Sequence, residues 1–326
     1  MQENILDILI CPNCKNQDLT INIDSKRDSH IISGEIRCSK CKSIYQIIDS
    51  VPIMLSKNKT KNNLNIKEND YRDKQIKYYA EKCDEGFEIN RPHNAGRLYQ
   101  YLIDYKFNKA FKSSPTPITN CTLLDVCCGS GMATEYYAKQ GAEVVGSDVS
   151  FAAVKRAKRR SQKKNFQSEF VVGDTENLPF KDDSFDFVCV HDGLHHLEKP
   201  RSGFRELSRI ARKSVFLIEP AKAFLTRISV FLGLSTDYED AGNFVYRFTK
   251  KELKKWSVGL GYTHNTTVRY LMFYPHFPPK WLRLFDNKIL FCLFLFCYNF
   301  MNCIFGFLGN KILFIAWDKS AQEEVE

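Results

Sequence analysis

Between residues 119 and 220, short apolar segments alternate with stretches of helical spacing. Five segments read as buried strands: TLLDVCC, AEVVGSD, QSEFVVGD, SFDFVCVHD and SVFLIEP. Further on, TKKELKKWSVGLGYTHNTTVRYL predicts a helix and a strand, and NKILFIAWDKS predicts a last strand. Strands that alternate with helices build a parallel sheet with helices on both faces. We therefore predict an α/β fold with a doubly wound, mostly parallel, seven-stranded sheet.

The loop after the first strand, LLDVCCGSGMAT, predicts a cofactor site at the carboxyl ends of the strands. A dinucleotide fingerprint would place its third glycine on Thr134, and Asp125 would repel phosphates. An acid before the loop suits a cationic ligand such as S-adenosylmethionine, which has no phosphate. Asp148 ends the next strand and can accept both ribose hydroxyls. Asp174 and Thr175 end the third strand, within reach of an adenine amino group.

Four stretches in this order resemble class I S-adenosylmethionine-dependent methyltransferases, in particular the type 11 group: LLDVCCGSG, VVGSDVS, GDTENLPFKDDSFDFVCVHDGLHHL and VFLIEP. The resemblance implies a Rossmann-like sheet and bound S-adenosyl-L-methionine. It also implies cofactor contacts by position, namely Asp125, Gly129 and Gly131 on the methionine part, Asp148 on ribose, Val149 on adenine, Asp174 and Thr175 on the adenine edge, and His191 at the end of the fourth strand.

Cys127 departs from that family, which usually has its first glycine at this point of the loop. Cysteine is small, but it disfavours a positive φ, so the substitution bears on cofactor affinity. A metal site at Cys127 and Cys128 is the alternative. Adjacent residues at a strand end point to opposite faces, and no second pair stands nearby, which disfavours a metal.

Four other cysteines, Cys11, Cys14, Cys38 and Cys41, form two C-x2-C pairs separated by 23 residues. Four thiolates make a closed tetrahedral zinc site, which is structural because no coordination position stays open. Disulfides are the alternative, but the N-terminus carries acidic residues where a signal peptide has positive charge, so we expect a cytoplasmic protein with reduced thiols. Residues 5–55 also resemble the zinc ribbon that partners and activates RNA and protein methyltransferases.

These features divide the chain into four expected parts. A zinc ribbon covers residues 1–55, and a polar Asn/Lys-rich linker covers residues 56–70. Residues 71–118 predict an N-terminal helical cap. The class I methyltransferase domain covers residues 119–320 and carries an apolar insertion at about residues 272–310.

Methyl transfer is an in-line displacement that mainly needs alignment and exclusion of water. A general base helps when the acceptor is a hydroxyl, a phenol or an acidic carbon. We consider His191 and Asp192 as catalytic candidates, and we expect His195 and His196 to pack at the start of the next helix. Three acidic residues after the fifth strand lie either in a substrate-covering loop or in a solvated one: Asp237, Glu239 and Asp240.

Residues 289–308, ILFCLFLFCYNFMNCIFGFL, contain no charge and are long enough to span a bilayer. A predicted strand of the same sheet follows at once, which disfavours a crossing. We therefore expect a helix or helical hairpin at the membrane surface, with four basic residues at the headgroups: Lys280, Arg283, Lys288 and Lys311. A buried core helix, a dimer helix and a tail-anchored span are the alternatives.

The combined prediction is a cytoplasmic methyltransferase, peripheral on the membrane, for a hydrophobic or membrane-associated small molecule such as a lipid, quinone or polyketide-like compound. An RNA methyltransferase is the second hypothesis, based on the ribbon and the basic run at residues 154–166 within a net charge of +9. We interpret that run as the solvated face of a helix, which makes nucleic acid the less favoured partner. A non-catalytic adaptor is the third hypothesis. The sequence does not define an oligomeric state.

Overall fold

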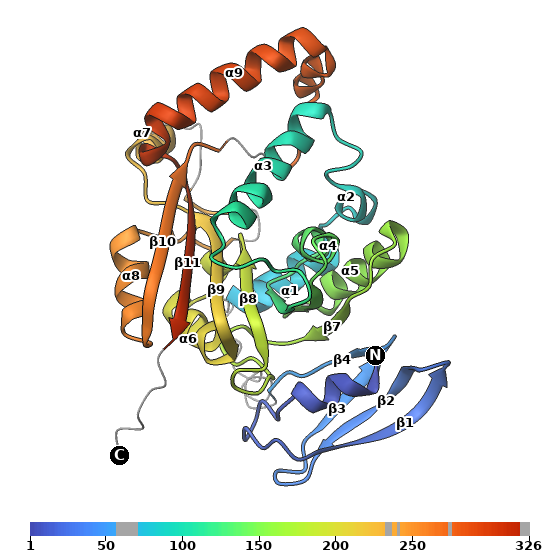
Figure 1. Ribbon diagram of the computed structural model, residues 1–326. Helices are drawn as coiled ribbons and strands as arrows, with labels where there is room; N and C mark the ends of the chain where they lie inside the picture. Colours follow the sequence, from blue (N-terminus) through green and yellow to red (C-terminus); the bar gives the residue numbers. More distant parts are fainter. Residues whose placement is uncertain (57–70, 232–236, 240–241, 273–275, 320–326) are drawn as a thin grey trace.

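Two sheets organise the chain in the computed structural model, which describes residues 1–56, 71–231, 237–239, 242–272 and 276–319 (Figure 1). The smaller sheet is antiparallel, in the order β1 (Leu19–Arg27), β2 (His30–Cys38), β3 (Ile44–Ile48) and β4 (Val51–Pro52). Asp49 and Ser50 both have positive φ between β3 and β4, as a tight two-residue hairpin turn requires. A 3-10 helix, η1 (Glu3–Ile8), precedes this sheet. All but Ser56 of the predicted linker lies outside the described residues.

The larger sheet has seven strands in the order β10-β11-β9-β8-β5-β6-β7. Pairing is parallel from β7 to β9, whereas β11 runs antiparallel to both of its neighbours. The predicted seven-stranded, mostly parallel sheet is therefore confirmed. Its strands are β5 (Thr122–Val126), β6 (Glu143–Asp148), β7 (Glu169–Val172), β8 (Phe185–His191), β9 (Ala211–Pro220), β10 (Tyr262–Tyr270) and β11 (Lys311–Lys319).

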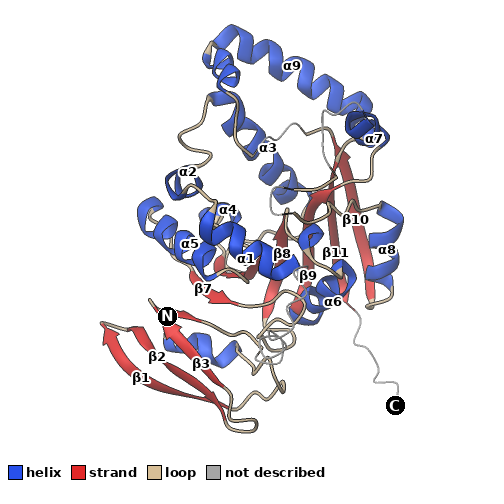
Figure 2. Cartoon of the chain, turned by 180° about the vertical axis from the view of Figure 1, so that it is seen from behind, coloured by secondary structure: helices blue, strands red, loops and turns tan. Residues whose placement is uncertain are grey.

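Helices cover both faces of this sheet (Figure 2). Alternate strand residues point to opposite faces, so Leu124 packs in the cluster with α6 and α8, and Leu123 packs in the cluster with α3 and α4. The helices of the sheet are α4 (Met132–Lys139), α5 (Phe151–Lys164), α6 (Pro200–Ile210) and α8 (Lys250–Val258). Within the predicted cap lie α1 (Tyr71–Glu81), α2 (Glu85–Asn90) and α3 (Arg97–Ser113).

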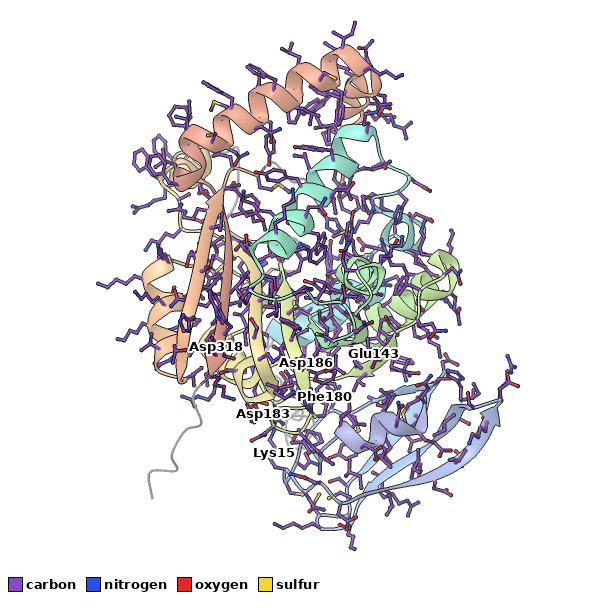
Figure 3. All side chains as sticks on the ribbon, in the orientation of Figure 1. Lys15, Glu143, Phe180, Asp183, Asp186 and Asp318 are labelled. Carbon is purple, nitrogen blue, oxygen red and sulfur yellow. The ribbon has the colours of Figure 1, made fainter. Side chains whose placement is uncertain are left out.

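The small sheet docks on the edge of the large one. Residue 53 bridges Val172 of β7, and the Met54 amide donates to the Val172 carbonyl at 2.8 Å. Leu9 bridges Phe180, and both side chains are fully buried in one apolar cluster that runs from one sheet to the other. Lys15 and Phe180 mark this contact (Figure 3). The ribbon segment therefore covers an edge strand that would otherwise stay unpaired.

Several basic residues of helix α5 contact other parts of the protein instead of solvent. Lys155 pairs with Asp49 of the ribbon segment at 3.2 Å. Arg156 donates to the Tyr79 carbonyl of α1 at 2.6 Å, and the fully buried Arg160 pairs with Glu135 at 2.8 Å. The expectation of a solvated face is thus wrong for Arg156 and Arg160. The spacing of basic residues along the sequence does not distinguish a buried ion pair from one at the surface.

The apolar insertion connects β10 to β11 through η5 (Lys280–Asp286), α9 (Lys288–Phe305) and η6 (Gly306–Leu308). It forms a single α-helix at the end of the molecule opposite the ribbon segment (Figures 1 and 2). The described residues contain one helix that is long and apolar enough to cross a membrane, Lys288–Leu308, and only 6% of its most apolar window is buried. The alternative of a buried core helix is therefore wrong.

Candidate functional site

A cavity of about 380 Å³ lies at the carboxyl ends of the parallel strands. Its floor comes from the loop after β5, the end of β8 and the 3-10 helix η4 (Leu194–His196), and α1 contributes its roof. Ligands of open α/β sheets bind in this position. Four predicted site residues line the cavity together: Cys127, Gly129, His191 and Asp192.

The loop after β5 bends through three residues of positive φ: Cys127 at +55°, Gly129 at +53° and Gly131 at +77°. A side chain at Gly131 would also come within 3.0 Å of the Ala157 methyl group on α5. Cys127 adopts the same left-handed conformation without a glycine's freedom, at a cost of roughly 1–2 kcal/mol. Its Sγ lies 3.3 Å from the Thr175 hydroxyl, and burial raises the pKa of its thiol well above the usual range.

Asp148 lies directly beneath this loop. One carboxylate oxygen accepts the Gly129 amide at 3.0 Å, and the other accepts the Ser150 amide at 2.9 Å. Each carboxylate oxygen keeps a further lone pair for a ligand hydroxyl. Burial raises the pKa of the Asp148 carboxyl group. The residue thus both fixes the loop and offers the acceptors that a ribose would need.

Asp125 has one unused acceptor. Its Oδ2 accepts the Thr134 hydroxyl at 2.5 Å, whereas the buried Oδ1 has no hydrogen-bond partner. Burial raises the pKa of this carboxyl group to about 7. A buried acceptor without a partner is costly, and a cationic ligand would satisfy it. The carboxylate acceptors of Asp125 and Asp148 beside the loop are therefore of the kind that the cation and the ribose of S-adenosylmethionine would need.

The adenine end of the predicted site is covered by α1. Arg72 approaches Asp174 at 3.8 Å, and Asp174 and Thr175 are both buried. Val149 is half-buried where β6 ends. Asp174, Thr175 and Val149 do not line the cavity. Asp125, Gly131 and Asp148 do not line it either. The structure therefore brings part of the predicted set into the cavity and places the rest beneath its wall, so the cofactor roles of these residues stay predictions.

The pKa values of Asp192 and His191 decide their protonation states in the cavity. Burial opposes ionisation of Asp192, but Lys311 and Lys106 outweigh it and hold its pKa well below the usual range. Burial and Lys106 lower the pKa of His191 to about 4, so its imidazole is neutral at pH 7. Its Nε2 lies 3.1 Å from the Asp192 carboxylate without hydrogen-bond alignment. Both side chains are therefore unprotonated at pH 7, and their lowered pKa values make both of them weak bases.

Lys311 is not placed as predicted. Instead of lying exposed near headgroups, its ammonium pairs with Asp192 in the cavity. Burial lowers the pKa of its neighbour Lys106, on α3, to about 7. The expectation failed because Lys311 is the first residue of β11, and β11 inserts between β9 and β10. Its position there carries the side chain toward the carboxyl ends of the parallel strands.

His195 does more than pack. Its Nδ1 lies 2.7 Å from Glu219 at the end of β9, and its Nε2 lies 3.1 Å from Glu239. Burial alone would lower the pKa of His195, but the two carboxylates raise it to about 9. Glu219 also accepts the Gly193 and Leu194 amides at 3.0 and 2.7 Å. Asp240 lies outside the described residues.

Sequence reasoning missed several residues that line the cavity: Gln75, Tyr78 and Tyr79 of α1, Arg91 and His276. It also missed the buried Glu219, which lies behind the cavity and holds His195 in place. The glutamate in VFLIEP was a usable signal, because it ends a parallel strand. The cap residues gave none, since nothing in their local pattern says where α1 docks.

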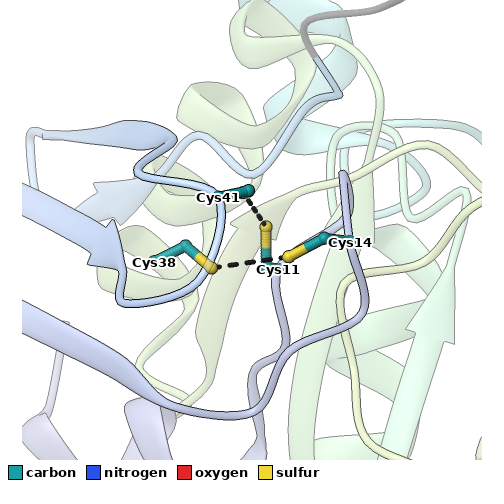
Figure 4. Close-up of side chains that lie close together, drawn as sticks. All are labelled: Cys11, Cys14, Cys38 and Cys41. Carbon is teal, nitrogen blue, oxygen red and sulfur yellow. Dashed lines mark hydrogen bonds between the residues drawn. The ribbon is translucent and has the colours of Figure 1, made fainter.

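The four predicted metal ligands come together in the ribbon segment (Figure 4). Cys11 and Cys41 have their sulfur atoms 3.4 Å apart, Cys14 and Cys38 have theirs 3.5 Å apart, and all four lie within 4.8 Å of one another. These separations exceed a disulfide bond of about 2.05 Å and suit thiolates about 2.3 Å from one tetrahedral ion. The cluster can therefore hold a metal ion.

A parallel sheet, a left-handed loop over a buried aspartate and an unsatisfied acid before the loop are features that a nucleoside-cofactor site of an open α/β sheet would have. Residues 124–218 match the family model described as "Methyltransferase domain". Residues 2–50 match the model described as "Trm112p-like protein". The chain is thus similar to a Trm112p-like protein in its first 50 residues and to a methyltransferase domain in its central part.

Individual relatives agree with this class. The chain is 37% identical over 90 residues to demethylmenaquinone methyltransferase of Paenarthrobacter aurescens, covering 28% of this chain and 34% of that protein. It is 34% identical over 109 residues to the enzyme of the same name from Clavibacter sepedonicus, covering 33% and 44%. The chain therefore spans less than half the length of these relatives.

One solved structure shows the same fold. Magnesium protoporphyrin IX methyltransferase from Synechocystis PCC 6803, with bound S-adenosylhomocysteine, matches with a TM-score of 0.50 at 17% identity. The match covers 76% of this chain and 100% of that one.

Proposed function

We propose that the chain transfers a methyl group from S-adenosylmethionine to a hydrophobic small molecule of quinone-like type, at the cytoplasmic face of a membrane. One observation carries this proposal: an exposed, predominantly apolar helix is inserted between β10 and β11 of a sheet whose central part is similar to a methyltransferase domain. The names of the curated relatives support a quinone-type acceptor.

S-adenosylmethionine supplies an activated methyl group with a good leaving group. Asp125 would face its charged methionine part, and Asp148 would accept the ribose hydroxyls. His191 and Asp192 would be the two candidates to accept the proton of an acceptor hydroxyl, and Lys311 would hold Asp192 ionised. The roof formed by α1 would exclude water from the reacting atoms.

The connectivity supports a helix that lies in the membrane surface rather than across it. Tyr270 at the end of β10 pairs directly with Lys311 at the start of β11, so the insertion leaves and re-enters the sheet at one place. A single crossing would separate these ends. Lys280, Arg283 and Lys288 flank the apolar face, where anionic headgroups would attract them.

We further propose that the cysteine cluster holds one structural zinc ion. Metal analysis after dialysis should find one equivalent in the intact protein, and Cys38→Ser should lose it. The exposed Cys292→Ser on α9 is the matched control and should keep it. A zinc-free protein with unchanged thermal stability would contradict the assignment.

Cys127→Gly should bind S-adenosylmethionine as tightly as the intact protein or several-fold more tightly. Glycine adopts the left-handed conformation of residue 127 without the steric cost that a cysteine has there. Calorimetric titration of both proteins measures this. A tenfold or larger loss of affinity for S-adenosylmethionine would contradict this expectation. It would show that the Cys127 thiol itself contributes to binding.

The RNA alternative has less support. Lys155, Arg156 and Arg160 of the basic helix engage partners inside the protein. Salt-dependent RNA binding, with tight binding at low salt, would restore this hypothesis.

A further inference from the structure

A second cavity, of about 610 Å³, lies between α2 and η5. Its lining is largely apolar and includes Phe87, Ala95, Pro278 and Leu282. Asn90 and Asn94 add amide groups, and Lys280 and Arg283 contribute cationic ones. The wall is fixed at one corner, because the Arg97 amide donates to Asp286 of η5 at 2.7 Å. A volume of this size is typical of a small-molecule site.

This cavity adjoins the methyltransferase cavity through a shared wall. Arg91 lines both cavities, and His276 and Phe277 line the first and the second respectively. Glu88 holds the wall together, since it lies 2.9 Å from His276 and 3.2 Å from Arg91. Arg91 in turn lies 3.1 Å from the His276 imidazole. Among the described residues, Arg91 is thus common to the two linings.

The second cavity shares the helix η5 with the apolar insertion, because Lys280, Leu282 and Arg283 line it. On η5, Trp281 and Leu284 are exposed, while Phe285 packs against Phe294 of α9 with ring centroids 5.3 Å apart. The second cavity is therefore bounded by a residue of the first cavity, Arg91, and by η5, which packs against α9.

We propose that the second cavity binds the apolar tail, a prenyl or acyl chain, of the methyl acceptor whose reactive head lies in the first cavity. This inference rests on the proposed function. The lining favours a chain because Phe87, Phe277, Pro278 and Pro279 give it a hydrocarbon surface to pack on. Each methylene buried there should tighten binding about fourfold. The Arg91 side chain would shift to let the chain pass.

Photocrosslinking with a farnesyl chain that carries a diazirine tests the inference on the full-length protein. The probe should label peptides that contain residues 86–97 or 277–283. Two variants should reduce this labelling at least tenfold by filling the cavity from opposite walls, Asn94→Trp and Pro278→Trp. Asn94→Ser is the matched control and should label like the intact protein. Thermal unfolding of each variant establishes that it is folded.

The outcomes separate this inference from the function on which it rests. Labelling confined to α9, or labelling unaffected by both tryptophans in folded protein, would overturn the tail site while S-adenosylmethionine binding persists. Labelling in the cavity that both tryptophans abolish supports it. Cavity labelling in a protein that shows no calorimetric binding of S-adenosylmethionine would overturn the proposed function but keep a lipid site.

Discussion

Leu293→Glu, Phe296→Glu and Phe300→Glu combined should release the protein from anionic liposomes in flotation. These side chains are 59%, 71% and 55% exposed on the outer face of α9. Burying each in the membrane interface would stabilise binding by about 1.5–3 kcal/mol, and a carboxylate there is unfavourable. We therefore expect at least a hundredfold weaker partition. The inward residues Phe291, which packs against Tyr101, and Phe294 stay unchanged, so the fold should persist.

The matched control places the same three charges on exposed apolar residues far from the insertion: Ile23→Glu, Ile48→Glu and Val258→Glu. That protein should float like the intact chain. If the intact chain does not float, or if the α9 triple variant floats equally well, the membrane proposal fails. A change from dimer to monomer in the α9 variant, without liposome binding by the intact chain, would favour the dimer-helix alternative.

Asp148→Ala should weaken S-adenosylmethionine binding at least a hundredfold in calorimetric titration. Hydrogen bonds to a charged group contribute about 1.5–3 kcal/mol each, and the ribose would make two. The substitution also removes the acceptor of the Gly129 amide, which positions the loop.

Asp183→Ala is the matched control, because it removes a surface carboxylate paired with Lys319 at the opposite end of the sheet. This variant should bind S-adenosylmethionine as tightly as the intact protein. Binding by Asp148→Ala within threefold of the intact chain would contradict the site. Absence of binding by the intact chain would favour the adaptor hypothesis.

Local patterns were enough to predict the sheet and the cysteine cluster. Strand ends such as Asp125 and Asp148 fall at one edge of a parallel sheet by topology, and C-x2-C pairs bring thiolates together by spacing. The sequence was therefore enough to predict which of these carboxylates and which of these thiolates lie near one another.

Long-range pairings were not predictable in this way. His195 meets Glu219 only because β8 and β9 lie side by side, and Arg160 is buried because Glu135 of α4 faces it. The exposure of α9 was also open, since an apolar helix has the same composition whether it packs in a core or on a membrane.

Methyl transfer from tritiated S-adenosylmethionine tests the central claim most directly. The intact protein is incubated with liposomes that contain demethylmenaquinone, and the label is extracted into organic solvent. The account predicts label in the quinone fraction with the intact chain and none with Asp148→Ala. No organic-extractable label with an intact chain that binds S-adenosylmethionine, or label recovered in RNA instead, would contradict it.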